Sequence, residues 1–190
     1  MNLLIAVLVA LAGASAPAAP AADPAVTDSL PPLAPRAMPA VAEVPVFWQT
    51  RAERTNYRLT ATYDETVEYV KRLATASPFL RVQSYGTSPQ GRDLVLVVAA
   101  KERAFTPELA RQSGKPVVLV QCGIHSGEIE GKDAMLALLR DVALGGPQQA
   151  LLDHCILLVV PMMSPDAHER SGHHDRPNHN GPEGTGRRTT

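Results

Sequence analysis

Residues 115–122 have the sequence KPVVLVQC, and residues 155–160 have the sequence CILLVV. Continuous apolar runs of this length are typical of strands that are buried on both faces of a sheet. The segment between them, residues 131–143, has helical periodicity with its apolar side chains on one side, namely Met135, Leu138, Leu139 and Val142. Strand, helix and strand in this order predict a βαβ unit in which the two strands are parallel.

The sequence before this unit predicts a helix and a hairpin. Thr62 and Glu65 match a capping box, and apolar residues then recur at helical spacing as far as Ser77. Residues 80–85 and 92–100 are strand-like segments on either side of the turn sequence GTSPQG. A hairpin here adds antiparallel strands to the parallel pair. The predicted fold class is therefore α/β, with a mixed parallel and antiparallel sheet and flanking helices.

The composition limits the classes of function. The chain has 190 residues, with 18 Lys plus Arg, 19 Asp plus Glu and a net charge of −1. A protein that binds nucleic acid would be expected to show a basic excess, which this chain lacks. Apolar residues make up 45% of the chain, which is enough for a globular core.

The first 45 residues precede the predicted domain. Residues 3–12 (LLIAVLVALA) form an apolar run that is too short for a membrane span, which needs about 20 residues. Residues 1–22 resemble a signal peptide with a cleavage site between residues 16 and 22, and a buried N-terminal helix is the alternative. Residues 23–45 are rich in Pro and Ala and predict an extended linker. We therefore expect an exported protein, periplasmic or extracellular, without a membrane span.

The residues best suited to chemistry lie in GIHSGE, residues 123–128, between the first apolar strand and the helix. Ligand sites of parallel α/β sheets lie at the carboxyl ends of strands. His125 and Glu128 supply an imidazole nitrogen and a carboxylate, which are both good zinc ligands. The spacing alone is a weak signal, and a surface histidine beside a helix-start glutamate is the alternative. The position at a strand end gives the two interpretations similar weight.

Three separated blocks of sequence resemble the zinc metallocarboxypeptidases, the carboxypeptidase A-like family, and in particular a bacterial exported branch of it. The blocks are GIHSGEIEGKDAMLALLRD (123–141), ILLVVPMMSPDAHER (156–170) and NGPEGTGRRTT (180–190). The resemblance implies a mixed α/β domain, zinc as the cofactor, and release of C-terminal residues from peptide substrates. Residues 46–190 would then be the N-terminal part of this catalytic domain.

The resemblance also implies roles for individual residues. His125 and Glu128 correspond to the first two zinc ligands, and Arg188 corresponds to the arginine that polarises the scissile carbonyl. The family's third zinc ligand, its general-base glutamate and its Asn-Arg pair for the substrate carboxylate would lie beyond Thr190. We therefore expect an incomplete carboxypeptidase-like domain, which as an isolated 190-residue chain is inactive and binds zinc weakly.

Two stretches depart from the family pattern, and a group of histidines needs a separate interpretation. Ser164-Pro165-Asp166-Ala167 stands where Asn-x-Asp-Gly is usual, and because alanine disfavours a positive φ we expect this loop to be shifted. Arg187 stands where the family has tryptophan. A polar, glycine-flanked group of histidines is expected to be a solvated loop, namely His168, His173, His174 and His179.

Two other functions are compatible with the sequence. An aspartoacylase-type zinc amidohydrolase shares a His-x-x-Glu zinc pair, but it would not be expected to carry the NGPE and RRTT blocks. A non-catalytic fragment that binds peptides without hydrolysing them is the second alternative.

The two cysteines are expected to stay unpaired. Cys122 closes the first strand and Cys155 opens the second. In a parallel pair they would lie near opposite ends, roughly 15 Å apart. A disulfide needs Cα atoms within about 7 Å, so we expect two small, buried apolar thiols.

Overall fold

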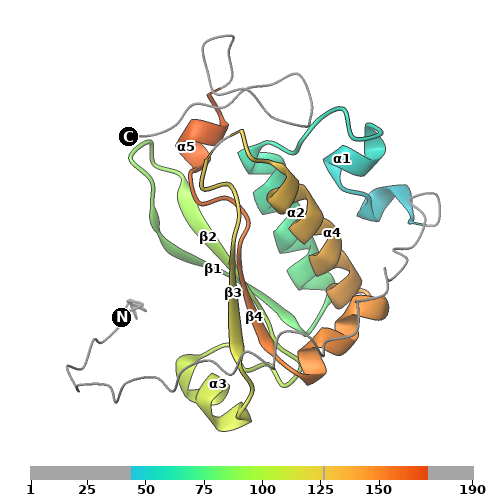
Figure 1. The fold of residues 1–190 in the computed structure, drawn as a ribbon, viewed down its shortest axis with the longest axis vertical. Coiled ribbons are helices and arrows are strands. Elements are labelled where there is room, and N and C mark those ends of the chain that lie inside the picture. Colours follow the sequence, from blue (N-terminus) through green and yellow to red (C-terminus); the bar gives the residue numbers. More distant parts are fainter. Residues whose placement is uncertain (1–43, 126, 171–190) are drawn as a thin grey trace, which may run out of the picture.

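The computed structural model describes residues 44–125 and 127–170 (Figure 1). A four-stranded sheet with the order β1-β2-β4-β3 forms its centre. The strands are β1 (Leu80–Thr87), β2 (Asp93–Ala99), β3 (Val117–Gln121) and β4 (Ile156–Val160). Strands β3 and β4 run parallel, whereas β1 with β2 and β2 with β4 are antiparallel. The predicted hairpin, βαβ unit and mixed sheet are therefore confirmed.

The helices are η3 (Val46–Trp48), α1 (Arg51–Arg54), α2 (Tyr63–Ala76), α3 (Pro107–Ser113), α4 (Glu130–Ala143), η4 (Pro147–Asp153) and α5 (Pro165–His168). Figure 1 shows α2 and α4 side by side across one face of the sheet. Helix α3 lies near the end of the sheet where β3 begins, and α5 lies near the end where β3 stops. None of the helices in the described part of the chain has the length and apolar character needed to span a bilayer.

Helix α2 begins where the sequence predicts. The Thr62 hydroxyl accepts a hydrogen bond from the Glu65 amide at 3.2 Å, and the Glu65 carboxylate accepts one from the Thr62 amide at 3.0 Å. This reciprocal pair satisfies two backbone donors that a helix start otherwise leaves free. The helix ends before Ser77, whose extended backbone suits a residue that precedes proline.

The main core lies between the sheet and the helices α2 and α4. Leu73 of α2, Leu139 of α4, and Val97 and Val159 of the sheet are fully buried. Burial of one such aliphatic side chain stabilises the fold by about 1.5–3 kcal/mol relative to exposure. This layer of packing fixes α4 on the sheet, and the chain segment before α4 carries His125 and Glu128.

The buried face of α4 differs from the predicted one. Leu136 is buried beside Leu139 and Val142, whereas Met135 and Leu138 are only half-buried. The helix is therefore rotated relative to the simple apolar stripe. Lys132, one turn before Leu136, is also fully buried.

The exposure of strand β3 differs from the prediction. The prediction of a strand buried on both faces is wrong, because Val117, Val118 and Leu119 are 48%, 42% and 54% exposed. Strand β3 pairs only with β4 and forms the edge of the described sheet. Strand β4, by contrast, lies between two strands and is buried as predicted. Both strands have the same apolar character, so the sequence alone does not separate the edge from the centre.

Both cysteines are free, as predicted. The register pairs Val117 with Ile156 and Gln121 with Val160, so Cys122 follows the end of β3 and Cys155 precedes the start of β4. Cys122 is buried, but Cys155 is only half-buried. The prediction of two buried thiols is therefore wrong for Cys155.

Candidate functional site

His125 and Glu128 come together at the carboxyl end of β3. His125 lies in the loop that follows β3, and Glu128 lies just before α4. The Nδ1 atom of His125 is 3.1 Å from each of the two carboxylate oxygens of Glu128. The side chains are 40% and 42% exposed, so both can be reached from solvent. The structure thus brings together the two residues that the sequence predicts as a pair.

Gly123 allows the sharp turn out of β3. Its φ is +60°, a conformation that residues with a side chain rarely adopt. A Cβ atom at this position would also lie 3.5 Å from the Cα of Met162. The loop of His125 therefore passes close to the backbone that follows β4.

The segment after β4 supports this loop through three hydrogen bonds. The Met163 amide donates to the Cys122 carbonyl at 2.8 Å, and the Ser164 amide donates to the Gly123 carbonyl at 3.1 Å. The Ser164 hydroxyl donates to the Ile124 carbonyl at 2.9 Å. Ser164 is one of the departures from the family pattern, and here it contacts the residue directly before His125.

Ala167, the other departure, lies inside α5 and is fully buried. It is not among the non-glycine residues with a positive φ, which in the described part of the chain are Asn56, Tyr57 and Arg103. Ala167 therefore does not adopt the positive φ that alanine disfavours, and the expected cause of a shifted loop is absent.

A buried polar cluster at the start of α4 was missed by the sequence analysis. Lys132 is fully buried, and its Nζ donates to the Thr60 hydroxyl at 2.6 Å, the Ala61 carbonyl at 2.8 Å and the Asp133 carboxylate at 3.0 Å. Burial lowers the pKa of the lysine, against the opposing effect of Asp133. A charged residue is seldom fully buried unless it is paired. No local signal in the sequence reveals Thr60 and Ala61 as partners, because they lie 72 and 71 residues earlier in the chain.

His168 belongs to this buried region, so the prediction that it lies in a solvated loop is wrong. Its side chain is 7% exposed, and Nδ1 is 2.9 Å from the Glu169 carboxylate. Burial lowers the pKa of the imidazole, and the Lys132 ammonium lowers it further. His173, His174, His179 and Arg188 lie outside the described residues, as do residues 1–22 of the predicted signal peptide and nearly all of the predicted linker.

The described residues do not complete a metal site. In residues 44–125 and 127–170, no group of three or more His, Cys, Asp or Glu side chains could hold a metal ion. His125 and Glu128 therefore stand as a pair of potential ligands. Both donor types suit zinc, which in catalytic sites has three protein ligands and a water.

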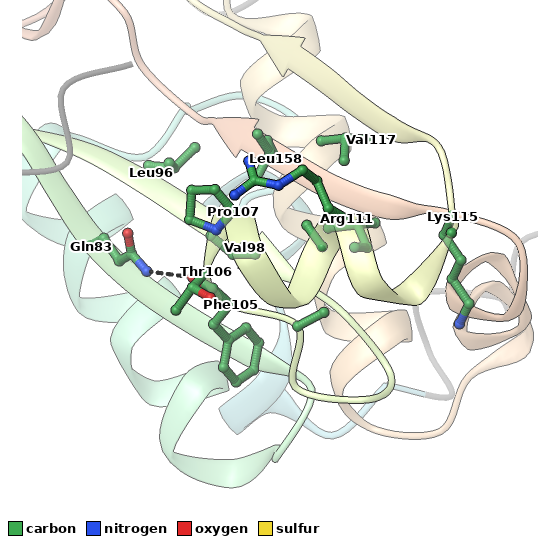
Figure 2. A pocket seen from close by; sticks show the side chains of 14 residues that line it. Gln83, Leu96, Val98, Phe105, Thr106, Pro107, Arg111, Lys115, Val117 and Leu158 are labelled. Carbon is green, nitrogen blue, oxygen red and sulfur yellow. Dashed lines mark hydrogen bonds between the residues drawn. The ribbon is translucent and has the colours of Figure 1, made fainter. Parts of the chain in front are cut away.

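An apolar concavity lies beneath α3, on the face of the sheet opposite α2 and α4 (Figure 2). It has a volume of about 650 Å³, and Leu96, Val98, Phe105 and Leu158 form much of its apolar wall. None of the residues that line it is a His, Cys, Asp or Glu. It therefore offers no metal ligand and no carboxylate or imidazole for catalysis.

Comparison with known families identifies the family of the chain. The sequence model of the zinc carboxypeptidase family matches residues 66–188, which is more than half of the chain. The chain belongs to the zinc carboxypeptidase family.

Two solved proteins share the fold over part of their length. Carboxypeptidase A from Helicoverpa armigera is 23% identical, with a TM-score of 0.50 over 57% of this chain and 25% of its own. Thrombin-activatable fibrinolysis inhibitor is 19% identical, with a TM-score of 0.52 over 64% of this chain and 29% of its own. The chain spans 25% to 34% of the length of the solved carboxypeptidases that it matches.

Proposed function

We propose that this chain is part of a zinc-dependent metallocarboxypeptidase that releases C-terminal residues from peptides, with His125 and Glu128 as two of the zinc ligands. One observation carries the proposal. In a member of the zinc carboxypeptidase family, an imidazole and a carboxylate face each other at 3.1 Å at the carboxyl end of a parallel strand.

The separation of the two side chains suits a shared metal ion. A tetrahedral zinc that binds a nitrogen and an oxygen at about 2.1 Å holds these atoms about 3.4 Å apart. His125 Nδ1 and the Glu128 oxygens are 3.1 Å apart, so they need to separate only slightly. Both side chains are exposed enough for an ion to enter.

The remaining parts of the reaction come from outside the described residues. Bound zinc supplies a water of lowered pKa and polarises a carbonyl. Arg188 is proposed, by its position in the sequence, to stabilise the negative charge that develops on the scissile carbonyl oxygen, as a guanidinium can. The third zinc ligand and the general base are proposed to lie outside the described residues.

A zinc titration of the isotope-labelled chain tests the proposed ligands. We expect zinc to shift the imidazole signals of His125 in NMR spectra with an affinity that is micromolar or weaker, because two ligands are fewer than a catalytic site supplies. Glu128→Gln should abolish this shift of the His125 signals. The matched controls are His154→Ala and Glu130→Gln, which alter exposed side chains of the same types and should leave it intact.

Activity is tested separately, on the product of the complete gene. We expect zinc-dependent release of C-terminal residues from peptides by that protein, and no turnover by the 190-residue chain. Activity that survives exhaustive removal of zinc would contradict the proposal. Peptide binding without hydrolysis, indifferent to chelators, would favour the non-catalytic alternative.

Export is also proposed, on the sequence of residues 1–22 alone. An apolar run of ten residues before Ala14-Ser15-Ala16 is typical of a signal peptide. N-terminal sequencing of the mature protein should begin between residues 17 and 23. A mature protein that still begins at Met1 would contradict this.

A further inference from the structure

The turn between β1 and β2 is joined to α5 by a compact group of polar contacts around Asp166. Asp166 is only 4% exposed. Its carboxylate accepts hydrogen bonds from the Ser88 hydroxyl at 2.8 Å, the Gln90 amide at 3.0 Å and the Arg92 guanidinium at 2.8 Å. Three donors from one five-residue turn therefore converge on one buried carboxylate.

The turn is organised to present these donors together. The Ser88 amide donates to the Arg92 carbonyl at 2.8 Å, and the Arg92 amide donates to the Ser88 hydroxyl at 3.0 Å. Gly91 has a φ of +84°, which closes the turn between them. The Arg92 guanidinium is also held by the Gln90 side chain at 2.8 Å. These hydrogen bonds within the turn hold the three donors in the arrangement in which they contact Asp166.

Asp166 connects the turn to the loop of His125. It lies two residues after Ser164, which donates from its amide to Gly123 and from its hydroxyl to Ile124. The segment from Ser164 to Asp166 is short and enters a one-turn helix, so we expect its two ends to be displaced together. A displacement of Asp166 would therefore be felt at the residue directly before His125.

We infer that Ser88 and Arg92 are positioning residues, which hold α5 through Asp166 and thereby fix the loop that carries His125. The inference rests on the proposed function, since it assigns to the hairpin turn the support of a proposed zinc ligand. Metal sites depend on outer groups that fix the orientation of their ligands. The turn and His125 lie more than thirty residues apart, and α5, which connects them, comes later in the chain than both.

Amide hydrogen exchange by NMR tests the connection without any metal. The amides of Met163 and Ser164 report directly on the hydrogen bonds to the His125 loop. In Arg92→Gln, which removes a charged hydrogen bond, we expect these two amides to exchange about ten- to a hundred-fold faster. Ser88→Ala should act in the same direction with a smaller effect. The amides in the centres of β2 and β4 should keep their wild-type rates.

The matched control is Arg81→Gln, which removes an exposed arginine from β1 of the same hairpin and should leave Met163 and Ser164 unchanged. The imidazole ¹⁵N shifts of His125 form a second readout, because they sense its contact with Glu128. We expect these shifts to change in Arg92→Gln and to return towards wild-type values in Arg92→Lys.

Three results would overturn the inference. The first is unchanged exchange at Met163 and Ser164. The second is an equal acceleration of all amides, which would indicate only lower global stability. The third is faster exchange at Met163 and Ser164 without any change in the His125 shifts. None of these measurements uses zinc, so failure of His125 to bind zinc in the wild-type chain would count against the proposed function and not against this connection.

Discussion

The guanidinium of Arg140 contacts the carboxylate of Glu53 at 2.5 Å, although 87 residues separate them. The side chains are 5% and 7% exposed, so the ion pair lies almost entirely out of water. Burial is the largest single influence and opposes ionisation of Glu53, but the hydrogen bonds from Arg140 and Thr50, together with the charge of Arg140, outweigh it, so the pKa of Glu53 is lowered. This contact joins the N-terminal segment that contains α1 to helix α4, which follows the site.

Removal of one partner of this pair should be strongly destabilising. Glu53→Gln keeps a residue suited to the capping box of α1 but leaves Arg140 as a buried, unpaired charge. We expect a loss of about 3–5 kcal/mol in the free energy of unfolding, measured by urea denaturation with an unchanged m-value. Glu53→Leu combined with Arg140→Met should cost less than the sum of the single changes. Glu108→Gln, which breaks an exposed pair with Arg111, is the control and should have no measurable effect.

Lowering the pH should reduce the stability of the fold, because His168 must then be protonated. Its pKa is lowered by burial and by Lys132, with Glu169 and Asp133 opposing, so the unfolded chain binds this proton more readily than the folded one. The stabilising effect is fully present above the ordinary histidine pKa of about 6.5 and is lost as the pH falls from there through the folded-state value. We expect the free energy of unfolding to decrease by up to about 1.4 kcal/mol per pH unit in this window.

Urea denaturation between pH 7.5 and 5 checks this dependence. His168→Leu should remove most of the slope, and the exposed His154→Gln should keep it. An equal slope in His168→Leu would assign the acid sensitivity to other groups.

The two cysteines should differ in reactivity and should not cross-link. Cys122 is buried and burial raises the pKa of its thiol, which lowers the fraction of reactive thiolate. Cys155 is half-buried, and we expect it to be alkylated first by a neutral maleimide reagent. Mass spectrometry of the oxidised chain should show no internal disulfide. A cross-linked peptide would contradict both this expectation and the parallel pairing of β3 with β4.

The exposed strand β3 should promote self-association. Its residues are Val-Val-Leu-Val-Gln without a charge, and an apolar edge strand is a template for pairing with another chain. Leu119→Lys places a charge on this edge at a position that is 54% exposed, and should lower association in sedimentation experiments. We expect the free energy of unfolding to change by less than about 0.5 kcal/mol. Leu144→Lys, at an exposed leucine outside the sheet, should leave association unchanged.

The parts of the fold that could be predicted depend on neighbours in the chain. The capping box of Thr62 and Glu65 and the pairing of His125 with Glu128 each join residues three positions apart. Such contacts leave a pattern in a short window of sequence. The order of the apolar segments then predicts the parallel pair, because only a crossover connection can join parallel strands.

Contacts between distant segments could not be predicted in this way. Asp166 meets Ser88 across 78 residues, and Lys132 meets Thr60 across 72. Each of these residues looks like an ordinary surface residue in the sequence, because charged and hydroxyl side chains are mostly exposed. Burial is acceptable for them only where hydrogen-bond partners arrive from elsewhere in the fold.

The sequence by itself determined the mixed α/β sheet, the starts and ends of its main helix, and the place of His125 and Glu128 at the end of a strand. Local backbone preferences and apolar periodicity are sufficient for these features. Only the tertiary structure decided that β3 is the edge of the described sheet, that the His168 side chain is largely buried, and that the β1–β2 turn is hydrogen-bonded to α5. The physical reason is that exposure and hydrogen-bond satisfaction depend on which segments pack together, and packing joins residues that are far apart in the chain.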